Sequence, residues 1–379
     1  MIPSKSRIID GQILQKKDMG GILFIRIDSR GQEIDTTAGK KKIDSDTFES
    51  LKSLHPGDYC RMEVVEDGSD LLISRLTVHV KIQKNYIAWD NQSKEILRAY
   101  AYILQSLREF FTSNDYCEVR LPTIHFGKTD GDIFSFDFFG KTARLTSSNS
   151  LFLNVYAVQL QKAFSVQKCF RAEKSHTNRH LAEFDMLEAA GFNLSLADAM
   201  ALLERALKHC LGKFHTSSFA HLSPLNFDRL IRNPFPTITY EEVARTYSLD
   251  NKGLGKFERK IATSQPTFVT YFPKKVASWT ARPLDDIYSR SFNLLLPGVG
   301  EAAEGTEKQT NKKWFSEKLR ISGMEEQLGW YLNMIPYSDF SLSEFGLGIE
   351  RLAMWILGVT NIRHINPVFR DTRFSEIPK

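Results

Sequence analysis

The first 80 residues alternate apolar and polar positions in short runs. Three such runs, separated by clusters of glycine, serine and aspartate, are GGILFIRID, DYCRMEVVED and LLISRLTVHV. A period of two with turn residues between the runs is typical of half-buried antiparallel strands. The pattern predicts a small β-barrel over residues 1–80, followed by a linker over residues 81–92.

From residue 93 onward the apolar residues take helical spacing. A long helix is predicted by Ile96, Leu97, Tyr100, Ile103, Leu104, Leu107 and Phe110. The segment CEVRLP that follows is interpreted as a strand ending at Pro122. Ser195, with Asp198 three residues on, predicts the start of a second amphipathic helix, which we interpret as a packing element. Residues 93–379 are expected to form one α+β domain around an antiparallel sheet.

The segment FRAEKSHTNRHLAEFDMLE, residues 170–188, combines dense charge with flanking apolar runs. It is predicted to be two paired strands joined by a polar loop, with Arg171 and Glu173 on one face of the first strand. A planar guanidinium binds phosphate through two points, and the Phe184 ring offers a face on which a base can stack. The segment therefore indicates a nucleotide site. A solvated hairpin with surface ion pairs is the alternative.

A second segment, FGLGIERLAMWILGVTNIR, places Gly346 and Gly348 just before a predicted helix that carries Glu350 and Arg351. Glycine allows a backbone to approach a ligand closely. Gly358 suits the position just past the end of the helix. The predicted apolar face consists of Ile349, Leu352, Ala353 and Ile356. Arg351 then points away from the packed side, toward a ligand or toward Glu350 as a structural ion pair.

Composition narrows the class of protein without naming a function. The chain has 379 residues, 42% of them hydrophobic and 25% charged, which is enough for a large domain and a small one. A net charge of +5 permits a nucleic-acid partner but does not require one. The four cysteines lack zinc-ligand spacing, so we expect no structural zinc and a reducing, cytoplasmic location. No apolar run approaches the roughly 20 residues of a membrane span, so no membrane partner is expected.

Together, segments 170–188 and 345–363 resemble signature motifs 2 and 3 of class II aminoacyl-tRNA synthetases, in the aspartyl, asparaginyl and lysyl subgroup and closest to the asparaginyl enzymes. The helix and strand ending at Pro122 resemble motif 1, and residues 1–80 resemble the subgroup's anticodon-reading OB-fold. Phe24 stands where that fold stacks a base, with core packing as the alternative. The resemblance covers nearly the whole chain. It implies an antiparallel-sheet catalytic domain, ATP and Mg2+ as cofactors, and a homodimer.

The resemblance also implies roles for individual residues. Arg171 matches the residue that holds the α-phosphate and the substrate carboxylate, and Arg351 the residue that holds the γ-phosphate. The other residues matched to ATP binding are Glu173, Arg179, His180, Phe184 and Gly348. Glu301 matches an acidic magnesium ligand, whereas Asn293 replaces an aspartate. A neutral amide attracts the cation less, so one magnesium ligand is expected to be weakened.

The amino-acid pocket departs from the subgroup's pattern. Asparaginyl enzymes read roughly SGQLxxE and aspartyl enzymes SPQLxxK on what is interpreted as a strand, where this chain reads SNSLFLN. The positions that match this part of the pocket are Ser148, Ser150 and Asn154. Leu153 replaces the aspartyl lysine, which makes aspartate a poor candidate substrate.

Two further matches complete the pocket. Asp130 matches the glutamate that holds the α-amino group. Glu344 replaces a glycine before motif 3, and EGTEK at 304–308 replaces GGSQR. An added acid favours a polar or cationic side chain in the substrate. Alternatively, Glu344 turns to solvent or pairs with a nearby lysine.

These departures leave three functional hypotheses. The first is an ATP-dependent enzyme that makes an aminoacyl-adenylate from an unusual amino acid and transfers it to tRNA or to a small-molecule amine. The second is an authentic asparaginyl-tRNA synthetase of divergent lineage. The third is a catalytically silent RNA-binding or regulatory paralog. The phosphate-binding arginines are retained while the substrate-reading positions change, which favours the first.

Overall fold

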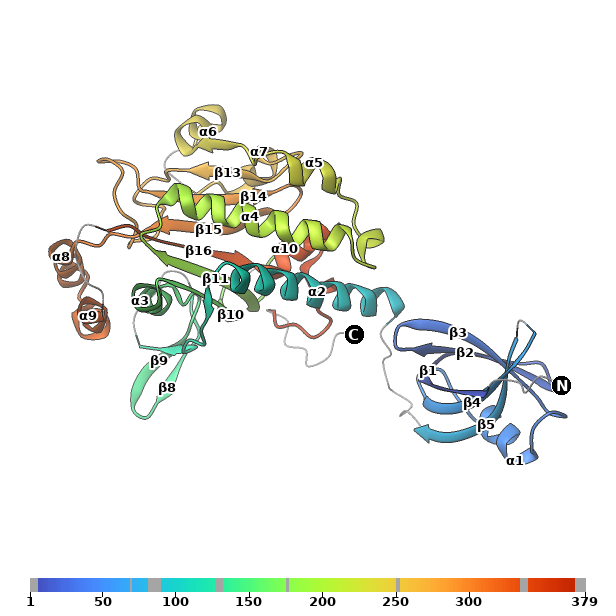
Figure 1. Ribbon diagram of the computed structural model, residues 1–379. Coiled ribbons are helices and arrows are strands. Elements are labelled where there is room, and N and C mark those ends of the chain that lie inside the picture. The colour runs from blue at the N-terminus through green and yellow to red at the C-terminus, as the bar shows by residue number, and fades with distance from the viewer. Residues whose placement is uncertain are drawn as a thin grey trace. The chain divides into compact units, whose positions relative to one another are not determined.

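The structure is a computed structural model that describes residues 6–68, 70–80, 90–126, 132–174, 177–249, 253–334 and 340–371. The chain divides into two compact units, Met1–Glu95 and Ile96–Lys379 (Figure 1). Most of the predicted linker, residues 81–89, lies outside the described residues. No helix in the described ranges is both long enough and apolar enough to cross a membrane.

The first unit contains a closed five-stranded barrel, as the alternating pattern predicted. Its elements are β1 (Ser6–Asp18), β2 (Ile22–Ser29), β3 (Gln32–Gly39), α1 (Ser45–Lys52), β4 (Tyr59–Asp67) and β5 (Asp70–Val80), with strand order β1-β2-β3-β5-β4. In β2, Leu23, Ile25 and Ile27 are buried in the barrel core. Phe24 alternates with them and is 46% exposed, so it lies on the outer surface and not in the core.

The second unit is built on an eight-stranded sheet of order β12-β13-β14-β15-β16-β11-β10-β6. These strands are β6 (Cys117–Glu118), β10 (Lys162–Phe170), β11 (Glu183–Phe192), β12 (Thr237–Thr239), β13 (Thr267–Thr270), β14 (Ser291–Leu296), β15 (Gly300–Glu307) and β16 (Leu342–Gly348). All neighbours are antiparallel except β12 with β13 and β10 with β6. A small second sheet, order β7-β9-β8, consists of β7 (Ile124–His125), β8 (Ser135–Phe138) and β9 (Lys141–Leu145).

Helices cover both faces of the large sheet. They are α2 (Asn91–Ser113), α3 (Ser150–Leu160), α4 (Leu196–His215), α5 (Phe227–Arg232), α6 (Tyr240–Tyr247), α7 (Glu258–Ile261), α8 (Lys312–Ser322), α9 (Glu325–Met334) and α10 (Ile349–Ile356), with short 3-10 turns at Ala220–Leu222, Gly255–Phe257 and Ile362–His364. Figure 1 shows α2 and α4 along one face. Their apolar residues share a core with Leu187 of β11, Leu294 of β14 and Leu347 of β16. The predicted helical spacing of α2 is therefore confirmed.

The opposite face of the central strands carries a row of polar residues. Across four adjacent strands, Asn293 faces Glu304, Glu304 faces Gly346, and Gly346 faces Glu188. Residues directly opposite each other on neighbouring strands share a face. A bulge leaves Ala302 without a partner on β14, which turns Glu301 toward the same face as Glu304. The register thus gathers four polar side chains on one side of the sheet.

Helix α4 begins where the sequence predicted. The Ser195 hydroxyl accepts a hydrogen bond from Asp198 N–H, and the Asp198 carboxylate accepts one from Ser195 N–H, each at 3.2 Å. This capping box satisfies backbone donors that the first helical turn cannot satisfy itself.

Replacing this cap tests how much it contributes. Ser195→Ala should lower the free energy of unfolding by about 1 kcal/mol, because one helix N–H loses its acceptor. Urea denaturation followed by circular dichroism measures the change. Ser218→Ala, at an exposed position, is the matched control and should stay within about 0.5 kcal/mol of wild type. Equal stability of the two variants would show that the cap contributes nothing.

Candidate active site

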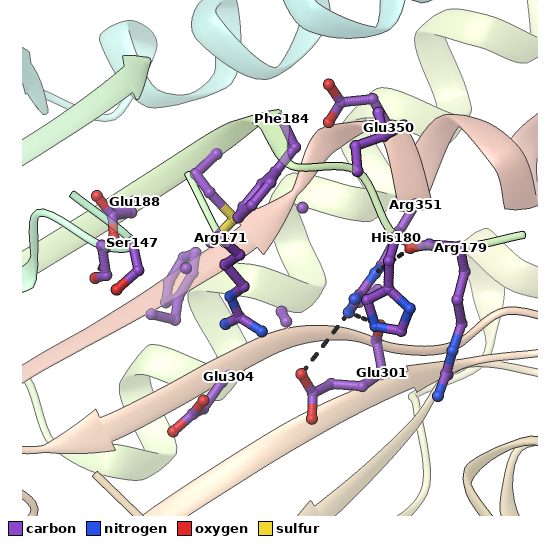
Figure 2. A pocket seen from close by; sticks show the side chains of 18 of the residues that line it. Ser147, Arg171, Arg179, His180, Phe184, Glu188, Glu301, Glu304, Glu350 and Arg351 are labelled. Carbon is purple, nitrogen blue, oxygen red and sulfur yellow. Dashed lines mark hydrogen bonds and ion pairs between the residues drawn. The ribbon is translucent and has the colours of Figure 1, made fainter. Parts of the chain in front are cut away.

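A cavity of about 170 Å3 lies on the polar face of the central strands (Figure 2). Its walls come from β11, β15 and β16, from the segments that follow β10 and precede α3, and from the first turn of α10. Most of the predicted site residues line it: Ser148, Ser150, Arg171, Glu173, Arg179, His180, Phe184, Glu301, Glu344, Gly348 and Arg351. Segments far apart in the sequence therefore meet in one pocket.

Arg171 projects into the middle of the cavity (Figure 2). Strand β10 ends at Phe170, so the prediction that Arg171 and Glu173 alternate along a strand is wrong. Their side chains nevertheless form an ion pair at 3.7 Å. The Arg171 guanidinium carbon also lies 5.9 Å from the centroid of the Phe184 ring. Stacking on an aromatic ring orients the planar guanidinium and leaves N–H groups available for an anion.

Arg351 closes one end of the cavity. Its Nη1 donates to the Glu301 carbonyl oxygen at 2.8 Å and lies 3.8 Å from the Glu301 carboxylate. Glu350 points elsewhere, because both of its carboxylate oxygens accept from Asp185 N–H, at 2.9 and 3.0 Å. Burial, with the charge of Asp185 nearby, raises the pKa of Glu350 to about 8. Glu350 thus joins α10 to β11 and leaves Arg351 directed at the pocket.

Arg179 and His180 border the same end. Arg179 Nη1 donates to the Glu258 carboxylate and, at 3.1 Å, to the Val299 carbonyl oxygen. A Cβ at Gly300 would lie 2.4 Å from this nitrogen, so a glycine is needed there for Arg179 to reach the turn. Burial and the neighbouring arginines lower the pKa of His180 to about 4, so His180 is neutral near pH 7. Positive charge at this end therefore comes from the arginines.

The other end of the cavity is acidic. Glu188 accepts hydrogen bonds from the Ser148 hydroxyl at 2.6 Å and from Asn149 N–H at 3.0 and 3.1 Å. Burial raises the pKa of Glu188 to about 7 despite these donors. Burial, reinforced by the Glu301 charge, likewise raises the pKa of Glu304 to about 7. The pocket is therefore divided into a cationic end and an anionic end.

Glu344 is held by two partners. Its carboxylate accepts from the Ser150 hydroxyl and forms an ion pair with Lys308. Lys308 is almost fully buried and also donates to the Thr280 hydroxyl at 2.8 Å. The alternative in which Glu344 pairs with a nearby lysine is therefore the arrangement observed. Lys308 is not free to bind an acidic ligand while Glu344 holds it.

Two predicted residues do not line the main cavity. Asn154 is fully buried in α3 and does not line it. The prediction that residues 148–154 form a strand is wrong, because α3 begins at Ser150 and places Ser150 and Asn154 one helical turn apart. Asn293 lines a smaller neighbouring cavity together with Glu301 and Glu304. Asp130 lies outside the described residues.

Asn293 bears on whether the site fits magnesium. Its Nδ2 donates to the Glu301 carboxylate at 2.6 Å, so a direct hydrogen bond joins the two side chains. The described parts of the chain contain no group of three or more acidic, histidine or cysteine side chains placed to hold a metal ion. Magnesium usually takes one or two carboxylates together with substrate phosphates. Glu301 fits one such ligand, and Asn293 fits as a second only with its amide oxygen turned toward the ion.

Sequence reasoning did not select Glu188, Glu304 or Lys308. For Glu188 a signal was present: Phe184, Met186 and Glu188 alternate along β11 and all line the cavity. Glu304 and Lys308 stood out only as departures from a family pattern. Their placement depends on how β15 pairs with both of its neighbours.

Comparisons with known proteins show which proteins this chain is similar to. Residues 77–371 match the family described as tRNA synthetases class II (D, K and N). The asparagine–tRNA ligase of Thermoplasma acidophilum is 28% identical over 96% of this chain and 95% of its own length. The mitochondrial asparagine–tRNA ligase of Schizosaccharomyces pombe is 31% identical over 73% of this chain and 68% of its own. The structure of asparaginyl-tRNA synthetase from Pyrococcus horikoshii complexed with asparaginyl-adenylate superposes with a TM-score of 0.88, at 22% identity, over 97% of this chain and 95% of that one.

The raised pKa of Glu188 predicts a pH dependence of stability. Between about pH 4.5 and 7 the unfolded chain releases the proton while the folded protein keeps it, so the free energy of unfolding falls as pH rises. Glu188→Gln removes this ionisation and should gain on the order of 1–3 kcal/mol relative to wild type between pH 4.5 and pH 8. Urea denaturation across this range measures it. Glu241→Gln, on the exposed side of α6, should keep the wild-type slope, and a Glu188→Gln slope equal to wild type would contradict the assignment.

The Asn293–Glu301 hydrogen bond predicts how a restored carboxylate behaves. Asn293→Asp places two carboxylates together, which should lower the melting temperature without magnesium and increase its rise when Mg2+ and a non-hydrolysable ATP analogue are added. Thermal denaturation over a Mg2+ titration tests this against wild type. A Mg2+-dependent shift no larger than that of wild type would place residue 293 outside the metal shell.

Proposed function

This chain belongs to the class II tRNA synthetases of the D, K and N group, a family of ATP-dependent ligases, and on that premise we propose that it activates an amino acid to an aminoacyl-adenylate. The observation that carries the proposal is the convergence of Arg171, Phe184 and Arg351 on one cavity. Two arginines, held by α10 and by the end of β10, suit a polyphosphate, and the ring suits a base.

The chemistry follows from where charge develops. A carboxylate oxygen of the amino acid attacks the α-phosphorus of ATP, the bond from that phosphorus to the bridging oxygen breaks, and pyrophosphate leaves. Positive groups already in place stabilise the growing charge without reorganisation. Arg171 is proposed to hold the α-phosphate and the attacking carboxylate, and Arg351 the γ-phosphate. Glu173 would lie near the adenine, and Phe184 beneath it.

The remaining residues at this end support the same step. Arg179 and His180 are proposed to cover the nucleotide, and Gly348 to let the backbone approach it. Magnesium, when bound, would neutralise charge on the phosphates, with Glu301 as its protein ligand. A hydroxyl or amine of an acceptor would then attack the adenylate carbonyl and release AMP. The acceptor is proposed to be tRNA or a small-molecule amine, and the active form a cytoplasmic homodimer.

The amino acid is proposed to differ from aspartate. An aspartate side chain needs a cation, and Lys308, beside the acidic end of the pocket, is already paired with Glu344. Leu153 stands where aspartyl enzymes have lysine and is fully buried in an apolar cluster. Ser148 and Ser150 present hydroxyls to the pocket. These features support activation of an amino acid with a polar or cationic side chain.

An authentic asparaginyl-tRNA synthetase is the second candidate. It is favoured by the length of the match, because the Thermoplasma asparagine–tRNA ligase aligns over nearly the full length of both chains, barrel included. Phe24, exposed on β2, is available to stack a base of RNA. Under this candidate asparagine is the amino acid and tRNA the acceptor. A charging assay with total tRNA and asparagine distinguishes the two candidates.

Removing either arginine tests the adenylation site. Arg171→Ala and Arg351→Ala should each lower amino-acid-dependent ATP–pyrophosphate exchange by about 100-fold, because each faces phosphate charge that grows in the transition state. Exchange is measured across a panel of amino acids. Arg232→Ala, at an exposed position on α5, is the control and should exchange at the wild-type rate. Exchange within a few-fold of wild type in both cavity variants would refute the site.

A further inference from the structure

At the acidic end of the cavity, Gly346 lies between Glu304 on β15 and Glu188 on β11 in the cross-strand row and contributes no side chain of its own. The Met186 methyl carbon lies over Gly346, since a Cβ there would come within 2.7 Å of it. In Figure 2, Glu188 and Glu304 lie to one side of Arg171, and Arg179 and Arg351 to the other. A ligand group bound between Glu188 and Glu304 would therefore lie on the side of the two carboxylates and away from Arg179 and Arg351.

Glu344 lies opposite Thr306 on β15 and Ala190 on β11, in the next cross-strand row. It indicates that the acidic end of the cavity is a binding site. Its side chain is about nine-tenths buried and lines the cavity. One carboxylate oxygen is held by Ser150 and Lys308, but the other, Oε2, is buried without a hydrogen-bond partner. A buried acceptor without a donor costs free energy, and a ligand that supplies one removes that cost.

Carboxyl groups outnumber ammonium groups at this end of the cavity. Glu188, Glu304 and Glu344 contribute three carboxyl groups, and Lys308 contributes one ammonium that Glu344 already binds. Burial holds the pKa of Glu188 and of Glu304 at about 7, and among the neighbouring charges Arg171 favours the ionised form of Glu304. The α-ammonium group of an amino acid would favour the ionised form of one of these two carboxyl groups. A second positive charge on the ligand would do the same for the other, whereas a neutral carboxamide such as that of asparagine would not.

We propose that the pocket selects an amino acid whose side chain carries a cationic nitrogen, bound beside the Met186 methyl group between Glu188 and Glu304, and that Glu304 determines this selectivity. The inference rests on the proposed ATP-dependent activation and names its substrate class. Glu304 is the discriminating residue because Glu188 is already bound by Ser148 and Asn149, whereas the Glu304 side chain is exposed to the cavity. Glu344 contributes to the same selectivity because it forms an ion pair with Lys308, which would otherwise attract an acidic side chain of the substrate.

The test uses the full chain and two measurements. ATP–pyrophosphate exchange is compared for 2,4-diaminobutyrate, ornithine, lysine, asparagine and aspartate, and calorimetry measures binding of the same amino acids without ATP or Mg2+. The kcat/KM of at least one cationic amino acid should exceed that of asparagine and of aspartate by about tenfold or more. Glu304→Gln should lower that value roughly 100-fold and leave the KM for ATP within about threefold. Glu241→Gln is the matched control.

A second variant tests the role of Lys308. Glu344→Gly removes its partner and should improve the kcat/KM of aspartate relative to the cationic amino acids by roughly tenfold or more, because the buried ammonium is then available. An unchanged ranking in Glu344→Gly would contradict the inference. The affinity of the Glu304→Gln variant for Mn2+ is measured by electron paramagnetic resonance. A variant that binds Mn2+ more weakly but keeps the wild-type ranking of amino acids would also contradict the inference.

The outcomes separate this inference from the proposed function. Asparagine as the best substrate, unaffected by Glu304→Gln, overturns the selectivity and leaves the activation intact. If none of the amino acids supports ATP–pyrophosphate exchange, the proposed activation is overturned, and calorimetry then tests the selectivity of the pocket. Binding of a cationic amino acid that is abolished by Glu304→Gln would still support the selectivity, and absence of such binding would overturn it.

Discussion

Strands β11 and β16 pair antiparallel with Met186 opposite Gly348 and Glu188 opposite Gly346, and the side chains that these two strands direct into the cavity depend on this register. Because side chains alternate faces along a strand, a slip of one residue would turn Glu188 and Glu344 into the apolar core beneath α2 and α4. Glu350 reinforces the pairing by accepting the Asp185 N–H from the first turn of α10. The cationic end and the acidic end are thus fixed by one sheet.

The two ends have opposite electrostatic character in a pocket that excludes much of the solvent. Burial raises the pKa of Glu188 and lowers that of Arg351, which shows that each charge is costly without its counterpart. A ligand with phosphates at one end and ammonium groups at the other would offset both costs at once. ATP and an amino acid, the two precursors of an aminoacyl-adenylate, together have this distribution of charge.

The departures from the family pattern act through pairs of residues. The resemblance in sequence matches Glu344 to a glycine, and the effect of Glu344 is exerted on Lys308, which it binds. It matches Asn293 to an aspartate, and the effect of Asn293 is exerted on Glu301, to which it donates. A substitution that changes the charge of one side chain therefore changes what a second residue can bind. Judging either position alone misses this coupling.

The sequence by itself determined the features that depend on neighbours along the chain. Alternation in residues 1–80 predicted the barrel, helical spacing predicted α2 and α10, and Ser195 with Asp198 predicted the start of α4, because periodicity and capping act over a few residues. The match to motifs 2 and 3 selected Arg171 and Arg351. Tertiary structure decided the rest. It made the segment after Asn149 a helix and placed Phe24 on the barrel surface.

The polar row and the buried pairs were also beyond the reach of the sequence. Glu188, Glu304 and Gly346 become neighbours only through the register of three strands that are distant in the chain. The bulge at Ala302 turns Glu301 and Glu304, three residues apart, to one face that simple alternation would have split. Lys308 meets Glu344 across the same sheet. No local pattern encodes these contacts, because strand pairing is set by how the whole core packs.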